Sequence, residues 1–126
     1  MISFLGKLFK VQDSKFVMSY EYEEDLDILY ISNNPERKKV DGSLAFGNVI
    51  IDVGTDGKVL GVEIDCASKF FGLNENMLNN LRFAKINIAR FGNLTTLGIA
   101  IAVQAKEYTI QFVVPEDRHK VPIVTY

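Results

Sequence analysis

The residues of this chain best able to do chemistry are carboxylates, and one group of them has the spacing of a calcium loop. Asp52, Asp56, Gly57 and Glu63 occupy positions 1, 5, 6 and 12 of an EF-hand loop, where oxygen ligands surround a hard cation. The flanking residues alternate between apolar and polar, which indicates strands and not helices. In the hairpin predicted below, Glu63 lies about 13 Å along its strand from the residue opposite Asp52. We therefore expect no calcium loop here.

A second group of carboxylates surrounds a predicted turn and consists of Glu21, Glu23, Glu24, Asp25 and Asp27. Neighbouring carboxylates raise one another's pKa and attract hard cations, but a solvated turn has the same composition. Nothing in this group supplies the histidines usual in transition-metal sites. We predict no metal site, and we keep four acidic side chains as candidates for a metal or small-molecule site: Asp25, Asp27, Asp52 and Glu63.

Other catalytic patterns are missing from the sequence. Cys66 falls on the predicted apolar face of its strand, so we expect it to be buried as a small hydrophobic residue. His119 is the only histidine and has no partner defined by spacing. Gly57-Lys58 resembles the end of a phosphate loop, but Val59 stands where Ser or Thr would hold magnesium. We predict no catalytic residue, no cofactor and no cofactor-binding residue, and we expect the protein not to be an enzyme.

Composition and charge narrow the class of protein. The chain has 126 residues, a net charge of −2 and 48% hydrophobic residues, values typical of one folded domain. A binder of nucleic acid would need a basic patch, so we expect no nucleic-acid partner. The longest apolar run is far shorter than the ~20 residues of a membrane-spanning helix, so we expect no membrane partner. A single cysteine allows no intrachain disulfide, which favours the cytoplasm.

Alternation of apolar and polar residues predicts antiparallel strands over residues 16–22 and 26–32, joined by the acidic turn. A clearer hairpin joins residues 48–53 to residues 58–66 through Asp56-Gly57. We predict that Val53 lies opposite Lys58. In that register the core face of the hairpin collects Val49, Ile51, Val53, Leu60, Val62 and Ile64, and Ile50 lies over the bare backbone of Gly61.

The second half of the chain predicts one short helix followed by a three-stranded meander. Asn74 is the expected N-cap of a helix over residues 74–83. Strands follow at residues 85–91, 95–103 and 108–114, and residues 119–126 are expected to add an edge strand. We predict a single domain of the α+β class, mostly β, with antiparallel hairpins and a meander of about 7–8 strands. Its parts are an N-terminal extension (1–14), a β region (16–70) and the helix with the meander (74–126).

A set of motifs runs through residues 20–70. It consists of Tyr22-x-Glu24-x-x-Asp27-x-Leu29-Tyr30-Ile31, of Asp52 and Asp56-Gly57, and of Val59-x-Gly61-x-Glu63-Ile64 with Ala67-Ser68. In these motifs the chain resembles the domain-of-unknown-function family numbered 2283, which comprises small prokaryotic and archaeal proteins. The resemblance implies a mostly β architecture and a cytoplasmic location, and it brings no catalytic residues. Leu26 and Cys66 depart from the pattern.

The function that we expect is a non-enzymatic protein-interaction or scaffold module acting as a homodimer. Two features favour this interpretation besides the missing catalytic residues. Ala100 and Ala102 form a strip on a predicted outer sheet face, and residues 82–126 carry a charge of +3 against −5 for residues 1–81. Two alternatives remain open, namely a small-molecule or divalent-metal binder that uses the acidic residues and an antitoxin-like regulator that masks a protein partner.

Overall fold

In the described part of the chain, the fold consists of two antiparallel sheets and two short helices, which confirms the predicted α+β, mostly β class. A computed structural model describes residues 19–92, 94–114 and 123–125. The larger sheet comprises β1 (Ser19–Glu23), β2 (Ile28–Ser32), β3 (Val40–Phe46), β4 (Val49–Gly54), β5 (Val59–Asp65) and β9 (Ile123–Thr125). The smaller sheet comprises β6 (Phe83–Phe91), β7 (Leu94–Val103) and β8 (Lys106–Val114), and helices α2 (Ala67–Phe71) and α3 (Glu75–Leu78) connect the two sheets. The predicted extension over residues 1–14 and the residue His119 lie outside the described residues.

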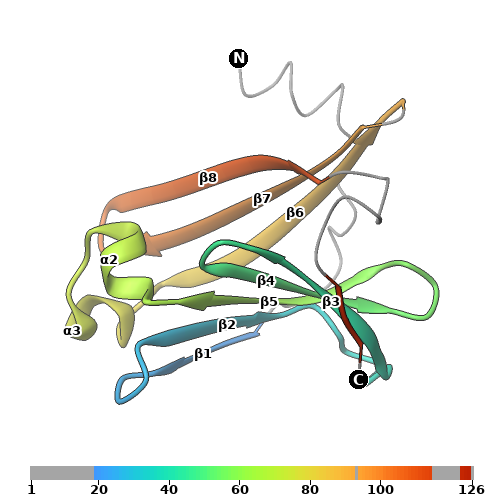
Figure 1. The fold of residues 1–126 in the computed structure, drawn as a ribbon. Helices are drawn as coiled ribbons and strands as arrows, with labels where there is room; N and C mark the ends of the chain where they lie inside the picture. Colours follow the sequence, from blue (N-terminus) through green and yellow to red (C-terminus); the bar gives the residue numbers. More distant parts are fainter. Residues whose placement is uncertain (1–18, 93, 115–122, 126) are drawn as a thin grey trace.

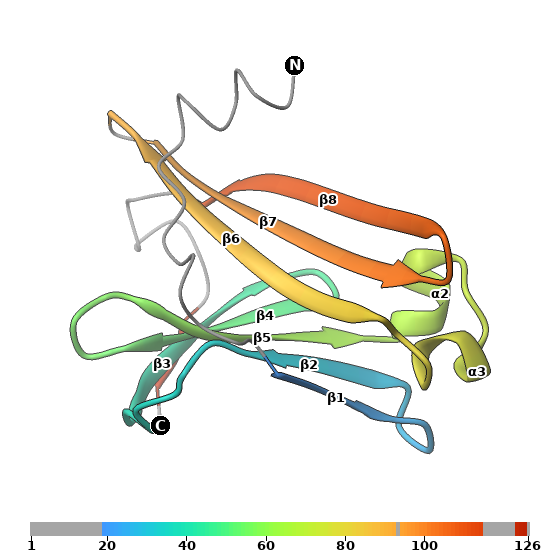
Figure 2. The ribbon, with the colours of Figure 1, turned by 180° about the vertical axis from the view of Figure 1, so that it is seen from behind.

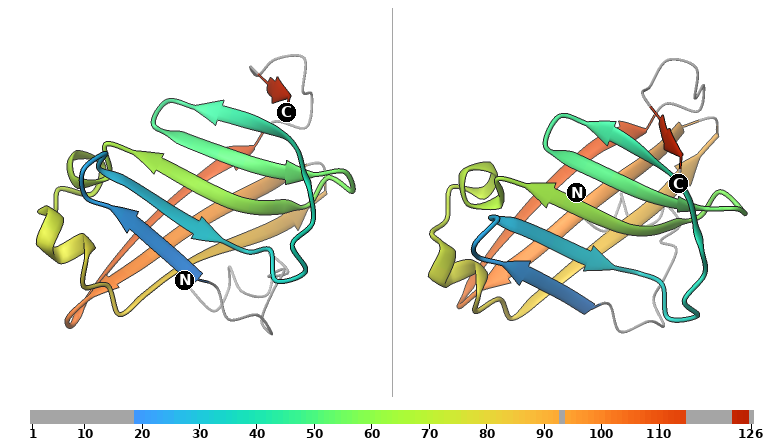
Figure 3. Two further views of the ribbon diagram at one scale, coloured as in Figure 1. Left: turned by 90° about the horizontal axis from the view of Figure 1, so that it is seen from below. Right: turned by 60° about the horizontal axis from the view of Figure 1, so that its bottom comes forward.

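The six-stranded sheet has the order β1-β2-β5-β4-β3-β9. A loop of residues 33–39 carries the chain from β2 to β3, and β5 then returns to pair with β2. Figure 3 shows this sheet from its outer side. The expected edge strand near the C-terminus is present as β9, which pairs with β3.

The hydrophobic core lies between the two sheets, which face each other in Figures 1 and 2. Alternate residues of each strand of the larger sheet point inward, as period-2 patterning requires. The larger sheet supplies Leu29, Ile31, Val49, Ile51, Val62 and Ile64, all at most 2% exposed, and the smaller sheet supplies Ile86, Leu97, Ile99 and Ile101. Five of the six predicted core residues of the second hairpin therefore lie in this core (Val49, Ile51, Val53, Val62 and Ile64), and Leu60 does not.

The register of that hairpin differs from the prediction. Gly54 N–H donates to the Lys58 carbonyl, and Gly57 N–H donates to the Gly54 carbonyl, so the loop has three residues and ends at Gly57 with a φ of 81°. This is the pattern of a type I turn followed by a glycine bulge. A second irregularity between Asp52 and Val53 shifts the ladder further, and Asp52 lies opposite Gly61. The shift is two residues from Asp52 to Val49, so those side chains keep their predicted faces, but it is one residue at Val53, which lies opposite Val59. Val59 therefore packs against the core, and Leu60, which was predicted there, is buried outside the core cluster.

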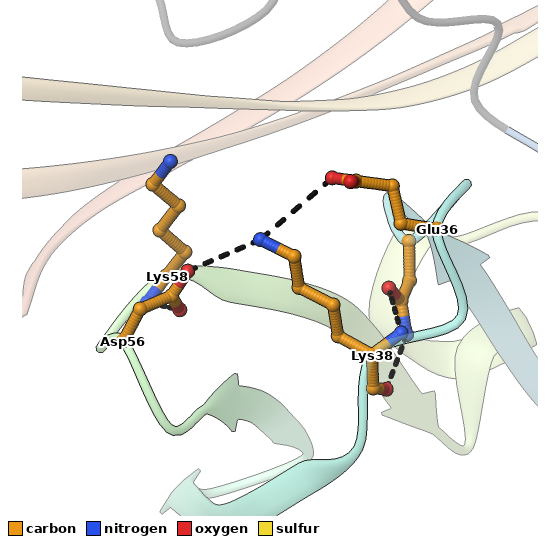
Figure 4. A network of polar contacts seen from close by, with 5 residues as sticks. Glu36, Lys38, Asp56 and Lys58 are labelled. Carbon is orange, nitrogen blue, oxygen red and sulfur yellow. Dashed lines mark hydrogen bonds and ion pairs between the residues drawn. The ribbon is translucent and has the colours of Figure 1, made fainter.

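An ion pair links the loop of residues 33–39 to this turn, as Figure 4 shows. The Lys38 ammonium lies 3.3 Å from Asp56 and 3.7 Å from Glu36. The other carboxylate oxygen of Asp56 accepts a hydrogen bond from the Lys58 N–H. This backbone hydrogen bond and the Lys38 ammonium lower the pKa of Asp56, which is therefore engaged in the turn.

Two segments between strands differ from the predictions. Leu26 was expected in the second strand, but it lies in the β1–β2 turn with 63% of its surface exposed. Asn74 caps α3 as predicted by accepting a hydrogen bond from the Met77 N–H. The helix ends at Leu78 and not at residue 83, because asparagines compete for backbone hydrogen bonds and the Arg82 N–H already pairs with the Ala102 carbonyl. The prediction of one helix also missed α2.

The alanine strip of the smaller sheet is not an exposed surface. Ala100 and Ala102 are 2% and 1% exposed. Their neighbours across the ladder carry longer side chains, with Lys85 and Thr109 beside Ala100. The ammonium of Lys85 lies over the Phe83 ring, 4.9 Å from its centroid, beside Ala102. The strip therefore cannot serve as the contact surface of a homodimer.

Candidate functional site

The outer face of the larger sheet gathers the acidic candidates of the second hairpin. Positions that alternate with the core residues point outward from β1 to β5. We call this surface the acidic face and define it by its larger outward residues: Glu21, Glu23, Ile28, Tyr30, Ile50, Asp52, Glu63 and Asp65. No described helix crosses it in Figure 3. Apolar side chains and carboxylates therefore share one flat surface.

Tyr30 lies at the centre of the acidic face and is held by Asp52. Its hydroxyl donates to Asp52 Oδ2 at 2.9 Å, and the Ser43 hydroxyl donates to Asp52 Oδ1 at 2.7 Å. To reach Asp52 the ring crosses Gly61, where an added Cβ would lie 2.6 Å from Tyr30 Cζ. The backbone of Gly61 thus lies beneath the Tyr30 ring, whereas the prediction placed Ile50 over it. Asp52 has a structural role that sequence did not reveal.

Glu63 lies closer to Asp52 than the sequence predicted. Gly61, which is opposite Asp52, is two residues from Glu63, about 7 Å along the strand instead of 13 Å. Glu63 and Asp65 are also on the same side of β5, because alternate residues share a face. Burial raises the pKa of Glu63, and the hydrogen bond with Asp65 and the charges of Asp65 and Asp52 raise it further. This hydrogen bond requires that one of the two groups be protonated, because two ionised carboxylates have no donor to offer each other. Asp65 Oδ1 is buried without a hydrogen-bond partner.

Neutralising Glu63 should stabilise the protein. Its raised pKa means that folding opposes ionisation, so stability falls as pH rises from the unfolded pKa, about 4.3, toward the folded one. We expect Glu63→Gln to raise the free energy of unfolding at pH 7, and the gain to disappear below about pH 4, where Glu63 is protonated in both states. Urea unfolding across this pH range measures it. Glu21→Gln on the same face is the control, with a change within about 0.5 kcal/mol. A Glu63→Gln protein no more stable than wild type at pH 7 would contradict the interpretation.

The acidic turn between β1 and β2 is organised around the side chain of Asp27. Asp27 adopts a left-handed φ of 53° and turns its carboxylate toward α2. It accepts hydrogen bonds from the Tyr22 hydroxyl at 2.6 Å, from the Ser68 hydroxyl at 2.6 Å and from the Ser68 N–H at 3.0 Å. The Ala67 N–H donates to the Asp27 carbonyl. Asp27 therefore fastens the start of α2 to the first hairpin.

These contacts shift the pKa values of Asp27 and Tyr22. Burial alone would raise the pKa of Asp27, but the hydrogen bonds from Ser68 and Tyr22 outweigh it and hold the pKa below its usual value. Burial and the adjacent Asp27 raise the pKa of Tyr22. Asp27 is thus an ionised acceptor at neutral pH. Its pKa favours a structural role over a role in proton transfer.

The remaining candidates do not assemble into a site. Asp25 is exposed in the turn, and Glu24 accepts a hydrogen bond from Asn79 beside a hollow of about 470 Å³ lined by Glu24, Ser68, Leu73, Asn74, Glu75 and Asn76. Among the described residues, no three His, Cys, Asp or Glu side chains are grouped so that they could hold a metal ion.

Cys66 is exposed and not buried as predicted, because β5 ends at Asp65 and Cys66 turns away with a φ of 52°. No helix in the described part of the chain is long and apolar enough to cross a membrane.

The observation that links these residues to known proteins is a family match of the segment that contains both hairpins. Residues 19–68 match the family described as "Protein of unknown function (DUF2283)". The match confirms the resemblance seen in the sequence, and it runs from β1 to the start of α2, so it includes both Asp27 with its partners and the Tyr30–Asp52 pair. The motif residues Tyr22, Asp27, Gly61 and Ser68 all have structural roles here.

One curated relative comes from Methanosarcina mazei and is named "Putative hypoxanthine phosphoribosyltransferase". It is 30% identical over 69 residues, which are 55% of this chain and 53% of that protein. The chain thus spans about half the length of this relative. No solved structure gives a significant match.

Sequence reasoning missed two residues of the acidic face, Tyr30 and Asp65, and the neighbouring Ser43, which donates a hydrogen bond to Asp52. Tyr30 was assigned to a central strand, and Ser43 had no assigned role. All three occupy outward positions beside Asp52 or Glu63 once the register is known. The alternation along each strand could have identified these outward positions. The bulges, however, concealed which residues lie next to each other across the sheet.

Proposed function

We propose that this protein is a non-enzymatic interaction module that works as a homodimer and binds a positively charged protein partner on its acidic face. The observation that carries the proposal is the composition of the strands behind this face. Strands β1 to β5 contain six carboxylates and no lysine, arginine or histidine. Such a single-sign surface steers a partner of opposite charge and rejects partners of like charge.

The shape of the acidic face suits a protein partner. Five strands at about 4.8 Å spacing and five to seven residues of about 3.3 Å each give a surface of roughly 20 by 24 Å. Its projected area, about 500 Å², is of the order of the ~800 Å² of accessible surface that one partner buries in a standard complex. Half-buried Ile28, Tyr30 and Ile50 supply apolar area between the charges. Tyrosine is a frequent centre of such interfaces.

The hydrogen bonds of Tyr30 support binding more than catalysis. Asp52 holds the tyrosine hydroxyl, and Gly61 beneath the ring leaves no room for a different side chain. A side chain fixed in this way loses little conformational entropy when a partner covers it. The same hydrogen bonds occupy the Asp52 carboxylate. The face is therefore arranged as a preorganised contact surface.

The name of the relative from Methanosarcina mazei suggests another activity, but the acidic face does not favour it. A phosphoribosyl donor carries several negative charges on its phosphates. Its approach to Asp52, Glu63 and Asp65 would be repelled, because the five strands behind them supply no cation. This face is suited to cationic ligands and not to that substrate class.

The proposal is tested by recovering partners from the native host with three forms of the protein. The wild type is compared with Glu63→Gln/Asp65→Asn and with the matched control Glu75→Gln/Asp25→Asn, which makes the same chemical and charge changes at exposed positions outside the acidic face. We expect a basic protein to bind the wild type and the control. For Glu63→Gln/Asp65→Asn we expect a dissociation constant at least tenfold higher. The identified partner is then titrated by calorimetry.

Salt dependence provides a second readout, since contacts between exposed charges weaken as ionic strength rises. We expect the affinity of the wild type to fall steeply between 0.05 and about 0.5 M salt. Equal binding by both double variants, or an affinity independent of salt, would contradict the proposal. A bound partner of strongly acidic composition would contradict it as well.

A further inference from the structure

Strand β8 forms an open edge of the smaller sheet. It pairs with β7 over nine consecutive residue pairs without a bulge, and no other described strand pairs with it. Figures 1 and 2 show β8 along the outside of the molecule. Alternate residues of such an edge direct their N–H and C=O groups away from the sheet, where they can pair with another chain.

Beyond its first two residues, β8 lacks the usual protection of an edge. Lys106 and Glu107 are charged, but residues 108–114 are Tyr-Thr-Ile-Gln-Phe-Val-Val, with no charge and no proline. These are mostly the β-branched and aromatic residues that favour strands. Natural proteins ordinarily blunt a long edge with lysines, prolines or bulges. An unprotected edge of this length indicates that another strand covers it.

The other edges are less suitable for pairing between copies. Strand β1 has five residues and exposes Glu21 and Glu23, so two copies of it would bring carboxylates together. Strand β6 is close to the larger sheet, where it contacts β1, and the Tyr20 hydroxyl donates to the carbonyl of Leu81 just before β6. Of these three edge strands, β8 is thus the one that a second chain can reach most readily.

Exposed apolar side chains mark the same region. Val113 of β8 is 53% exposed, and Leu94 at the start of β7 is 50% exposed. Both point to the outer side of the smaller sheet, since Val113 lies opposite Thr96, two residues from Leu94. Among the described residues, two of the four exposed large hydrophobic side chains therefore lie on the outer side of the smaller sheet.

We propose that β8 pairs antiparallel with β8 of a second copy of this chain, so that two three-stranded sheets join into one continuous six-stranded sheet. This inference rests on the homodimer of the proposed function and names its contact surface. An antiparallel strand is complementary to itself, because a twofold axis perpendicular to the sheet places the same edge groups of each copy opposite each other. A nine-residue strand offers an edge about 30 Å long.

The twofold axis makes a specific geometric prediction. One residue of β8 must lie opposite its own copy, with a Cα separation of about 4.5–5.5 Å. That separation falls within the range that a disulfide can bridge. Residues on either side lie progressively farther from their own copies.

Lysines placed on the edge test the pairing. In Thr109→Lys/Gln111→Lys, lysines of the two copies face each other across a central pairing, and like charges directly opposite are unfavourable. The matched control is Thr55→Lys/Gln104→Lys, which makes the same replacements at exposed turn positions. By analytical ultracentrifugation we expect the wild type and the control to have twice the mass of the 14.2 kDa chain. We expect the dissociation constant of the edge variant to rise at least tenfold.

Single cysteines at each of residues 107–113, in a Cys66→Ser background, provide a readout that does not depend on weakening the dimer. Cys66 is replaced because it is exposed, and its side chain makes no capping hydrogen bond. Under mild oxidation we expect covalent dimers to peak at one residue and to fall on both sides. Thermal melts of each variant confirm that it is folded.

The outcomes separate the two proposals. A wild-type protein that stays monomeric at high micromolar concentration overturns both the homodimer and the β8 pairing. A dimer that survives in the edge variant and shows no cross-linking peak overturns the β8 pairing alone. A dimer that dissociates in the edge variant and cross-links at one residue supports both the homodimer and the β8 pairing. Binding of a basic partner by the dissociated variant is measured in a separate experiment.

Discussion

Gly61→Ala is expected to lower the free energy of unfolding by about 2–3 kcal/mol, the range of an overpacked buried site. The added methyl group would overlap the Tyr30 hydroxyl and lie 3.2 Å from the carbonyl oxygen of Ile31. The tyrosine ring would have to leave its position, and its hydrogen bond to Asp52 would be lost. The backbone carbonyl cannot move without disturbing the ladder between β2 and β5. Urea unfolding at neutral pH measures the change.

A matched control is present in the other sheet. Gly98 is a buried strand glycine on β7, but an added Cβ there would meet Gln111 Cγ at 3.5 Å, an ordinary contact distance. Gly98→Ala should therefore be neutral or slightly stabilising, because alanine loses less backbone entropy on folding. Equal losses at the two positions would show that Tyr30 does not fill the space above Gly61.

A double-mutant cycle tests the same contact directly. Tyr30→Ala removes the ring that the new methyl group would meet, so Gly61→Ala should cost less in that background than in the wild type. The expected coupling between the two positions is about 1–2 kcal/mol. Additive effects would place the cost of Gly61→Ala elsewhere, for instance at the Ile31 carbonyl.

The comparison of sequence with structure shows which features depend only on alternation. Five of the six inward positions of the second hairpin were predicted correctly although the register was wrong, because a shift of two residues keeps side chains on their faces. Leu60 is the exception, since at Val53 the shift is one residue and Val59 takes the inward position. The register itself depends on the length of the loop before Gly57 and on a bulge at Asp52, and neither has a signal in the alternation. The distance between Asp52 and Glu63 was overestimated for this reason.

Side-chain contacts across the fold could not be predicted. Asp27 was identified as an acidic candidate, but its partner Ser68 is 41 residues away and lies in a helix that the pattern did not indicate. Cys66 was assigned to a buried face by continuing the strand one residue too far. Ala100 and Ala102 look like an open strip only when the lengths of their neighbours on β6 and β8 are ignored. Each error concerns a contact between segments that are separate in the sequence.

Asp27→Ala is expected to lower the free energy of unfolding by about 3–4 kcal/mol. It leaves the Tyr22 hydroxyl, the Ser68 hydroxyl and the Ser68 N–H without their shared acceptor, and hydrogen bonds to a charged group contribute about 1.5–3 kcal/mol. The left-handed backbone at this position adds about 1 kcal/mol, because alanine tolerates it less well than aspartate. Asp25→Ala, in the same exposed turn, is the control and should change stability by no more than about 0.5 kcal/mol.

The pH dependence of Asp27→Asn distinguishes the charge of Asp27 from its shape. Asparagine tolerates the left-handed backbone and keeps one acceptor oxygen, so we expect a loss of about 1–2 kcal/mol at pH 7. The pKa of Asp27 is lower in the folded state than its unfolded value near 3.9, so the stability from the ionised carboxylate is fully present above that pH. It is lost as pH falls through the folded pKa. The gap between wild type and Asp27→Asn should therefore narrow below pH 4, and a gap that stays constant to pH 2 would show that Asp27 acts by shape alone.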